Sequence, residues 1–153
     1  MAANTNPIFS RRGDVQVGTQ VAGAANLTTT AVTATDGSGA LVPIYQADAT
    51  EGSWVEGVSF KAIGSPAATV LRVFFCSATG AFTPGTTNTT TNTSLLGEIT
   101  TAAWTASSNT SSPEYYLPIR RPLPPGTRLL LGSGTSTGAA GNSFAATTFG
   151  GLY

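Results

Sequence analysis

Histidine is absent from this 153-residue sequence, and cysteine and lysine occur once each. Without histidine the chain has no Ser-His-Asp or Cys-His catalytic arrangement, and one cysteine allows neither an internal disulfide nor a zinc site of cysteine and histidine. We therefore expect a protein that is not an enzyme and that holds no metal and no cofactor. Cys76 lies in the apolar run VLRVFFCS, which predicts a small buried side chain rather than a reactive thiol.

Charged residues are scarce as well. They make up 9% of the chain, with seven basic and seven acidic residues, whereas ordinary soluble domains carry about 25%. Binding to nucleic acid depends on a basic surface, and this chain has no net charge and no basic stripe. Its polar surface must consist of Thr, Ser, Asn and Gly, a composition that fits an extracellular or virion assembly.

Long apolar runs are also missing. No segment approaches the roughly 18 continuous apolar residues of a membrane span. The first residues lack the basic segment and apolar run of a secretory signal. We expect no membrane partner.

The stretch of residues 53–77 has the clearest strand pattern in the chain. In its first half Trp54 and Phe60 fall on one side and polar residues alternate with them, which predicts a strand with one buried face. Glu56 is the one residue that interrupts this alternation. The second half, residues 70–76, is apolar on both sides, as is typical of a central strand that is covered twice.

Further strands are predicted from the same alternation and from the turn residues between them. They cover residues 14–22, 27–34, 40–47, 95–101, 114–121, 128–131 and 142–149. Pro43 cannot donate a ladder hydrogen bond, which predicts a sheet edge or a bulge at that position. The polar residues 78–94 are predicted to form an exposed loop that links strands in different sheets.

These short strands, with no apolar period of 3.6 residues, predict an all-β fold. We expect an antiparallel β-sandwich that is jelly-roll-like, with an immunoglobulin-like sandwich as the alternative. Residues 14–153 would form this single domain. Residues 1–13 are polar apart from Ile8 and Phe9, which predicts an extended N-terminal arm or a disordered terminus.

Four apolar residues lie on strand faces that one sandwich interior does not need to bury. They are Val70, Phe74, Cys76 and Leu130. Either the second sheet or another subunit must cover them, and an exposed patch of this kind is unusual on a monomer. We therefore predict them as a candidate subunit interface of a homo-oligomer.

Two glutamates inside predicted strands, Glu56 and Glu98, could form the carboxylate pair of a glycosidase if they lay roughly 5–10 Å apart. The simpler expectation is that Glu56 reaches the rim of the sheet or pairs with an arginine such as Arg72 or Arg128.

Four segments, taken in order along the chain, resemble small structural proteins encoded among the head genes of tailed bacteriophages. The segments are NTNPIFSRRGDVQVG, ATVLRVFF, PLPPGTRLLLGSG and FAATTFGGLY. The proteins that they resemble are capsid decoration, or cement, proteins. The resemblance implies a homotrimer on the outer capsid surface of the virion that binds across neighbouring copies of the major capsid protein, without catalysis.

The resemblance also implies a role for the N-terminal arm. Ile8 and Phe9 would be its apolar anchor on the capsid, and Arg11 and Arg12 would meet carboxylates of the shell. The doublet Arg120–Arg121 is a weaker candidate, because successive residues of a strand point to opposite faces.

The alternative is a carbohydrate-binding or receptor-binding β-sandwich of a phage tail or head fibre. Trp54, Trp104, Tyr115 and Tyr116 could stack on sugars. Trp54 is in phase with Phe60 and is predicted to be in the core. Trp104, in a polar loop, is the one aromatic residue whose substitution would test this alternative.

Overall fold

The computed structural model describes residues 12–17, 31–138 and 141–152, which form eight strands and no helix. The strands are β1 (Arg12–Val17), β2 (Val42–Gln46), β3 (Ser53–Ile63), β4 (Thr69–Cys76), β5 (Thr93–Thr101), β6 (Glu114–Leu123), β7 (Arg128–Ser133) and β8 (Ser143–Leu152). Each overlaps a strand predicted from the sequence. The sequence predicted a further strand over residues 27–34. Residues 31–34 do not form a strand in the structure, and residues 27–30 lie outside the described part. No helix in these ranges is long and apolar enough to cross a membrane.

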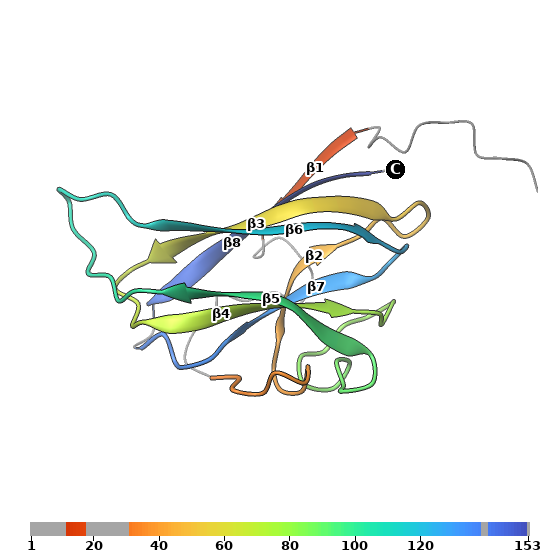
Figure 1. Ribbon diagram of the computed structural model, residues 1–153, viewed down its shortest axis with the longest axis horizontal. Coiled ribbons are helices and arrows are strands. Elements are labelled where there is room, and N and C mark those ends of the chain that lie inside the picture. The colour runs from red at the N-terminus through yellow and green to blue at the C-terminus, as the bar shows by residue number, and fades with distance from the viewer. Residues whose placement is uncertain (1–11, 18–30, 139–140, 153) are drawn as a thin grey trace, which may run out of the picture.

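The strands form two antiparallel four-stranded sheets, with the orders β1-β8-β3-β6 and β2-β7-β4-β5. β1 pairs with β8, β2 with β7, β3 with β6 and β4 with β5. The chain is therefore doubled on itself like one long hairpin and then rolled, so that β8 also pairs with β3 and β7 with β4. This is the eight-stranded jelly roll, and Figure 1 shows its two layers. The strand order rules out the immunoglobulin-like alternative.

The connections between sheets differ from those predicted. The long loop of residues 77–92 joins β4 to β5, which are neighbours in one sheet. The short turn at residues 64–68 instead carries the chain from β3 in one sheet to β4 in the other. The prediction that the long loop links different sheets is wrong.

Pro43 lies where the sequence predicted it. β2 is an edge strand of its sheet, and its pairing with β7 shifts register between Pro43 and Tyr45. The missing N–H of Pro43 is tolerated at such a position.

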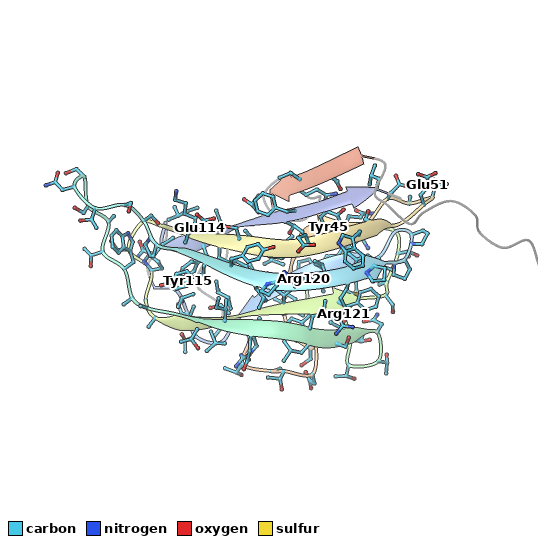
Figure 2. All side chains as sticks on the ribbon, turned by 45° about the horizontal axis from the view of Figure 1, so that its top comes forward. Tyr45, Glu51, Glu114, Tyr115, Arg120 and Arg121 are labelled. Carbon is cyan, nitrogen blue, oxygen red and sulfur yellow. The ribbon has the colours of Figure 1, made fainter. Side chains whose placement is uncertain are left out.

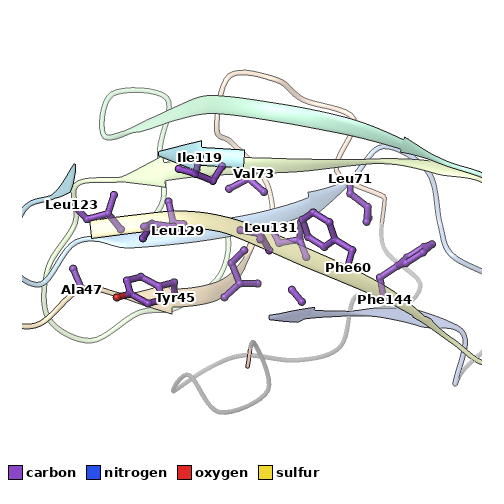
Figure 3. Packing of buried hydrophobic residues seen from close by; sticks show 14 of the residues in the cluster. Tyr45, Ala47, Phe60, Leu71, Val73, Ile119, Leu123, Leu129, Leu131 and Phe144 are labelled. Carbon is purple, nitrogen blue, oxygen red and sulfur yellow. The ribbon is translucent and has the colours of Figure 1, made fainter. Parts of the chain in front are cut away.

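The main core lies between the two sheets and is almost entirely apolar (Figure 3); its polar groups include the hydroxyls of Tyr45 and Thr148. Its largest side chains include Tyr45, Phe60 and Phe144, each at most 2% exposed. Both sheets contribute through alternate residues. The alternation read from the sequence thus places residues such as Phe60 and Leu71 correctly on the inner faces.

A second, smaller core lies on the other face of the β2-β7-β4-β5 sheet. It consists of Val32, Leu41, Phe74, Cys76 and Leu130, with Ala78, Phe82 and Leu95 packed against it. This finding corrects the predicted subunit interface, because Phe74, Cys76 and Leu130 are fully buried within one chain. Val70, the fourth predicted residue, is half-buried.

Hydrogen bonds hold the covering loops in place. The buried amide of Asn88 donates to the carbonyl oxygens of Gly37 and Gly39, both at 2.8 Å. The guanidinium of Arg128, on β7, donates to the carbonyl oxygens of Ala78 and Gly80. The stretch of residues 77–92, predicted to be an exposed loop, is therefore in large part a lid on the second core.

The two sheets are also joined by polar contacts between the edge strands β1 and β2. The hydroxyl of Tyr45 donates to Asp14 at 2.8 Å. The side-chain amide of Gln16 donates to Gln46 O at 2.9 Å and accepts from Gln46 N at 3.0 Å. Gln16 thus uses its side chain to satisfy backbone groups at the edge of β2.

The second core predicts how its central residue contributes to stability. Phe74→Ala removes a fully buried ring and should lower the free energy of unfolding by about 3–5 kcal/mol. Because the cover comes from the same chain, this loss should not depend on protein concentration. Val70→Ala, at a half-buried site on the same face of β4, is the control and should cost much less. Chemical denaturation at several protein concentrations measures both, and a concentration-dependent loss for Phe74→Ala would contradict this assignment.

Burial raises the pKa of the Tyr45 hydroxyl far above its ordinary value near 10, and Asp14 raises it further although Ser53 opposes the shift. The folded chain keeps this proton above about pH 10 while the unfolded chain releases it, so stability falls as pH rises beyond that point. Tyr45→Phe should make this alkaline loss of stability shallower, at a cost of about 1 kcal/mol at neutral pH. Thermal unfolding between pH 7 and 11 measures the effect. Tyr116→Phe, at an exposed ring, is the control, and equal slopes for wild type and Tyr45→Phe would refute the prediction.

Candidate interaction surface

The outer faces of the two sheets are covered to different extents. Loops 31–41 and 77–92 pack on the outer face of the β2-β7-β4-β5 sheet and are seen below β4 and β5 in Figure 1. Within the described ranges, no residue forms a buried cluster on the outer face of the β1-β8-β3-β6 sheet. This second face, which we call the open face, is the candidate interaction surface.

Large apolar side chains form a row across the open face. Val15, Tyr116 and Phe149 are 56%, 47% and 39% exposed. Val15 of β1 is the register partner of Phe149 of β8, and Phe149 is the partner of Gly57 of β3. The ring of Tyr116, from β6, lies directly over Gly57. The row therefore crosses all four strands of the sheet.

A bulge in β3 sets which side chains reach this face. Val55 pairs with Gly150 and Gly57 with Phe149, so Glu56 is an extra residue opposite β8. An extra residue reverses the alternation of a strand. Val55 is consequently buried, whereas Trp54 is half-buried and donates to Glu56 on the outer side. The prediction that Trp54 belongs to the core is wrong, and the interruption at Glu56 marks the bulge.

Four charged residues lie on the open face in two pairs of opposite sign. Arg120 Nε lies 3.1 Å from Glu56 Oε1, and both side chains are exposed. Arg120 has a φ of 49°, a left-handed conformation opposite the bulge. Further along the same two strands, Lys61 is the register partner of Glu114, and both are exposed.

The two glutamates considered as a catalytic pair are not brought together. Glu56 lies on the open face, whereas Glu98 lies on β5 of the other sheet and pairs with Arg72 at 3.1 Å. Glu56 does pair with an arginine, but with Arg120 rather than with Arg72 or Arg128. No group of three His, Cys, Asp or Glu side chains in the described ranges is placed to hold a metal ion.

The residues predicted for capsid binding lie at the start of the chain. Ile8, Phe9 and Arg11 lie outside the described residues. Arg12 begins β1 and pairs with Leu152, so the domain begins before residue 14.

The second arginine doublet is divided between two environments, as expected for successive strand residues. Arg120 lies on the open face. Arg121 lines a cavity of about 190 Å³ at the β5–β6 edge of the sandwich, together with Phe75 and Leu96. Both arginines are labelled in Figure 2.

The remaining aromatic candidates pack against the core rather than standing free. Trp104 and Tyr115 are half-buried against the main core. The Tyr115 ring meets Phe144 edge-on at 6.3 Å, and its hydroxyl accepts from Ala102 N at 3.0 Å. Trp104, the aromatic residue singled out as a test of sugar binding, is therefore partly covered by the core, and the open face instead carries Trp54 and Tyr116.

The contact between Gly57 and Tyr116 can be tested by substitution. A Cβ atom at Gly57 would overlap the Tyr116 ring and lie 2.8 Å from Leu117 O. Gly57→Ala should therefore destabilise the fold by about 1–3 kcal/mol. In the Gly57→Ala/Tyr116→Ala double variant the loss should be smaller than the sum of the single losses, because part of the clash is removed. Additive losses in chemical denaturation would show that the ring does not lie on Gly57.

Comparison with known proteins found no matching family model, no similar curated protein and no similar solved structure.

Proposed function

We propose that this chain is a structural protein of a phage virion that decorates the outer capsid surface. It would bind as a homotrimer across neighbouring major capsid subunits and stabilise the shell. The observation that carries this proposal is the open face: an apolar row with balanced charges on a jelly roll whose opposite outer face is already covered by its own loops. The resemblance of four sequence segments to decoration proteins supports the same function.

The mechanism in this proposal is mass action. A protein that binds the assembled shell but not its free subunits stabilises the shell by RT ln(1 + [L]/Kd) at each site, about 2.7 kcal/mol when the free concentration is 100 times Kd. Many repeated sites add their contributions. A surface with few charges suits this role because its contacts depend little on salt.

The N-terminal segment, residues 1–11, joins the domain at β1 and also has a role in this proposal. Residues 1–11 directly precede β1, an edge strand of the sheet that carries the open face. In this reading Ile8 and Phe9 anchor the segment on the capsid, while Arg11 meets carboxylates of the shell.

A second candidate function is carbohydrate or receptor binding by a tail or head fibre. Its support is the pair of aromatic side chains on the open face, Trp54 and Tyr116, beside the carboxylate of Glu56. Aromatic rings and carboxylates are groups that bind sugars by stacking and hydrogen bonding. Glycan binding that disappears in Tyr116→Ala, without any binding to capsids, would favour this function.

The decoration function is tested with the Ile8→Ala/Phe9→Ala variant. If the two side chains are buried at the capsid, their loss should weaken capsid binding at least about 100-fold, because each contributes about 1.5–3 kcal/mol. Co-sedimentation with phage heads prepared without the protein measures the affinity. Deletion of residues 1–11, which ends before β1, should act in the same direction.

The control for this experiment is Thr90→Glu, which changes an exposed residue of the loop that covers the second core. It should leave capsid binding unchanged. Decoration of heads at wild-type occupancy by the chain without residues 1–11 would contradict the role of this segment. Failure of the wild-type chain to bind any head would contradict the proposed function.

A further inference from the structure

The open face has the dimensions of a specific protein contact. Strands lie about 4.8 Å apart and rise about 3.3 Å per residue, and β6 and β8 have ten residues each. With the six residues of β1 and the eleven of β3, the four strands cover roughly 590 Å². Two such faces packed together would bury about 1,200 Å², the lower limit for stable specific interfaces.

The charges of the open face lie on β3 and β6, a central strand and an edge strand, and alternate in sign along and across these two strands. Glu56 is negative and Lys61 positive along β3, while Arg120 is positive and Glu114 negative along β6. The apolar row at Gly57 and Tyr116 lies between the two pairs. A strongly acidic or strongly basic partner would gain nothing from this arrangement, because the face is neutral and carries both signs.

We propose that the open face binds the open face of a second copy of this chain through an isologous two-fold contact. The two-fold axis runs across the strands, between the levels of Glu56 and Lys61. Rotation about this axis places β3 against the β3 of the second copy, in the opposite direction. Glu56 then meets Lys61 of the second copy, and Arg120 meets Glu114 of the second copy.

This orientation satisfies the apolar row as well as the charges. The row lies close to the axis, so Val15, Tyr116 and Phe149 of each copy pack against the same residues of the other. Two sheets packed face to face with nearly aligned strands are the ordinary arrangement inside a β-sandwich. A two-fold axis along the strands, between β3 and β6, would also pair opposite charges, but it would leave β1 and β8 of each copy, with Val15 and Phe149, outside the contact.

The inference does not rest on the proposed function, since it concerns copies in solution without a capsid. A two-fold contact joins copies in pairs, and the open face cannot contact a second copy and a capsid subunit at the same time, so the two contacts exclude each other. The partner is inferred to be a second copy because the charges and the apolar row of the open face are complementary to themselves.

The test uses complementary charge reversals at low ionic strength. Lys61→Glu places like charges opposite each other twice in the symmetric contact, and so does Glu56→Lys. Each variant alone should self-associate at least about tenfold more weakly than wild type in analytical ultracentrifugation. An equimolar mixture of the two variants should recover association, because each reversed residue then meets its opposite charge. If the two variants self-associate more weakly than wild type and also remain monomeric when they are mixed, the proposed geometry is wrong.

The apolar row is tested separately. Phe149→Glu should abolish association at micromolar concentration, whereas the control Thr90→Glu should associate like wild type. Circular dichroism and thermal unfolding check that each variant is folded. If Phe149→Glu does not fold, a nitroxide label on Val15→Cys provides a second measurement, because the natural cysteine is buried. In a chain that carries Val15→Cys as its one substitution, spin–spin coupling between the labels of two associated copies should be detectable.

Two results would overturn the proposal outright. One is a wild-type chain that sediments as a single 15.4 kDa monomer at a concentration of about 100 μM. The other is a monomeric wild-type chain, together with a Val15→Cys variant whose cysteine reacts with a labelling reagent only after residues 1–11 are deleted. That second result would assign the face to the chain's own N-terminal segment.

Discussion

Burial of apolar side chains on both faces of β4 is the constraint on which the rest of this structure depends. The face toward the second sheet carries Leu71 and Val73, and the opposite face carries Phe74 and Cys76, all with no exposed surface. The chain covers the second set with its own loops, which are held by Asn88 and Arg128. Because these loops cover the outer face of one sheet, the described part of the chain leaves the outer face of the other sheet open. The asymmetry of the molecule follows from this one requirement.

The open face owes its composition to the bulge in β3. With regular alternation Trp54 would point inward and Val55 outward. The extra residue reverses this, brings Trp54 to the surface and sets Glu56 beside Arg120. This one residue brings both an aromatic and a charged side chain to the surface, and the pairings of β3 with β6 and with β8 both shift register there.

Much of the fold could be predicted from the sequence, but little of the candidate surface. Period-two alternation and turn residues locate the strands, because strand geometry forces neighbouring side chains to opposite faces. Alternation does not say which element covers a second apolar face, and so it leaves Phe74 and Leu130 as a predicted subunit contact. It also fails at a bulge, where it shows Glu56 as an interruption but predicts Trp54 in the core. Val15 and Phe149 become neighbours only through pairing between the two ends of the chain, which no local pattern records.

The nested pairing of the jelly roll has a consequence for synthesis. β4 and β5 can pair as soon as they leave the ribosome, but β1 must wait for β8, whose last residue pairs with the first residue of β1. β8 also separates β1 from β3, so an incomplete chain has no neighbour to hold β1. A chain that ends before β8 therefore leaves β1 without a partner strand, and only a chain that extends through Leu152 completes this sheet.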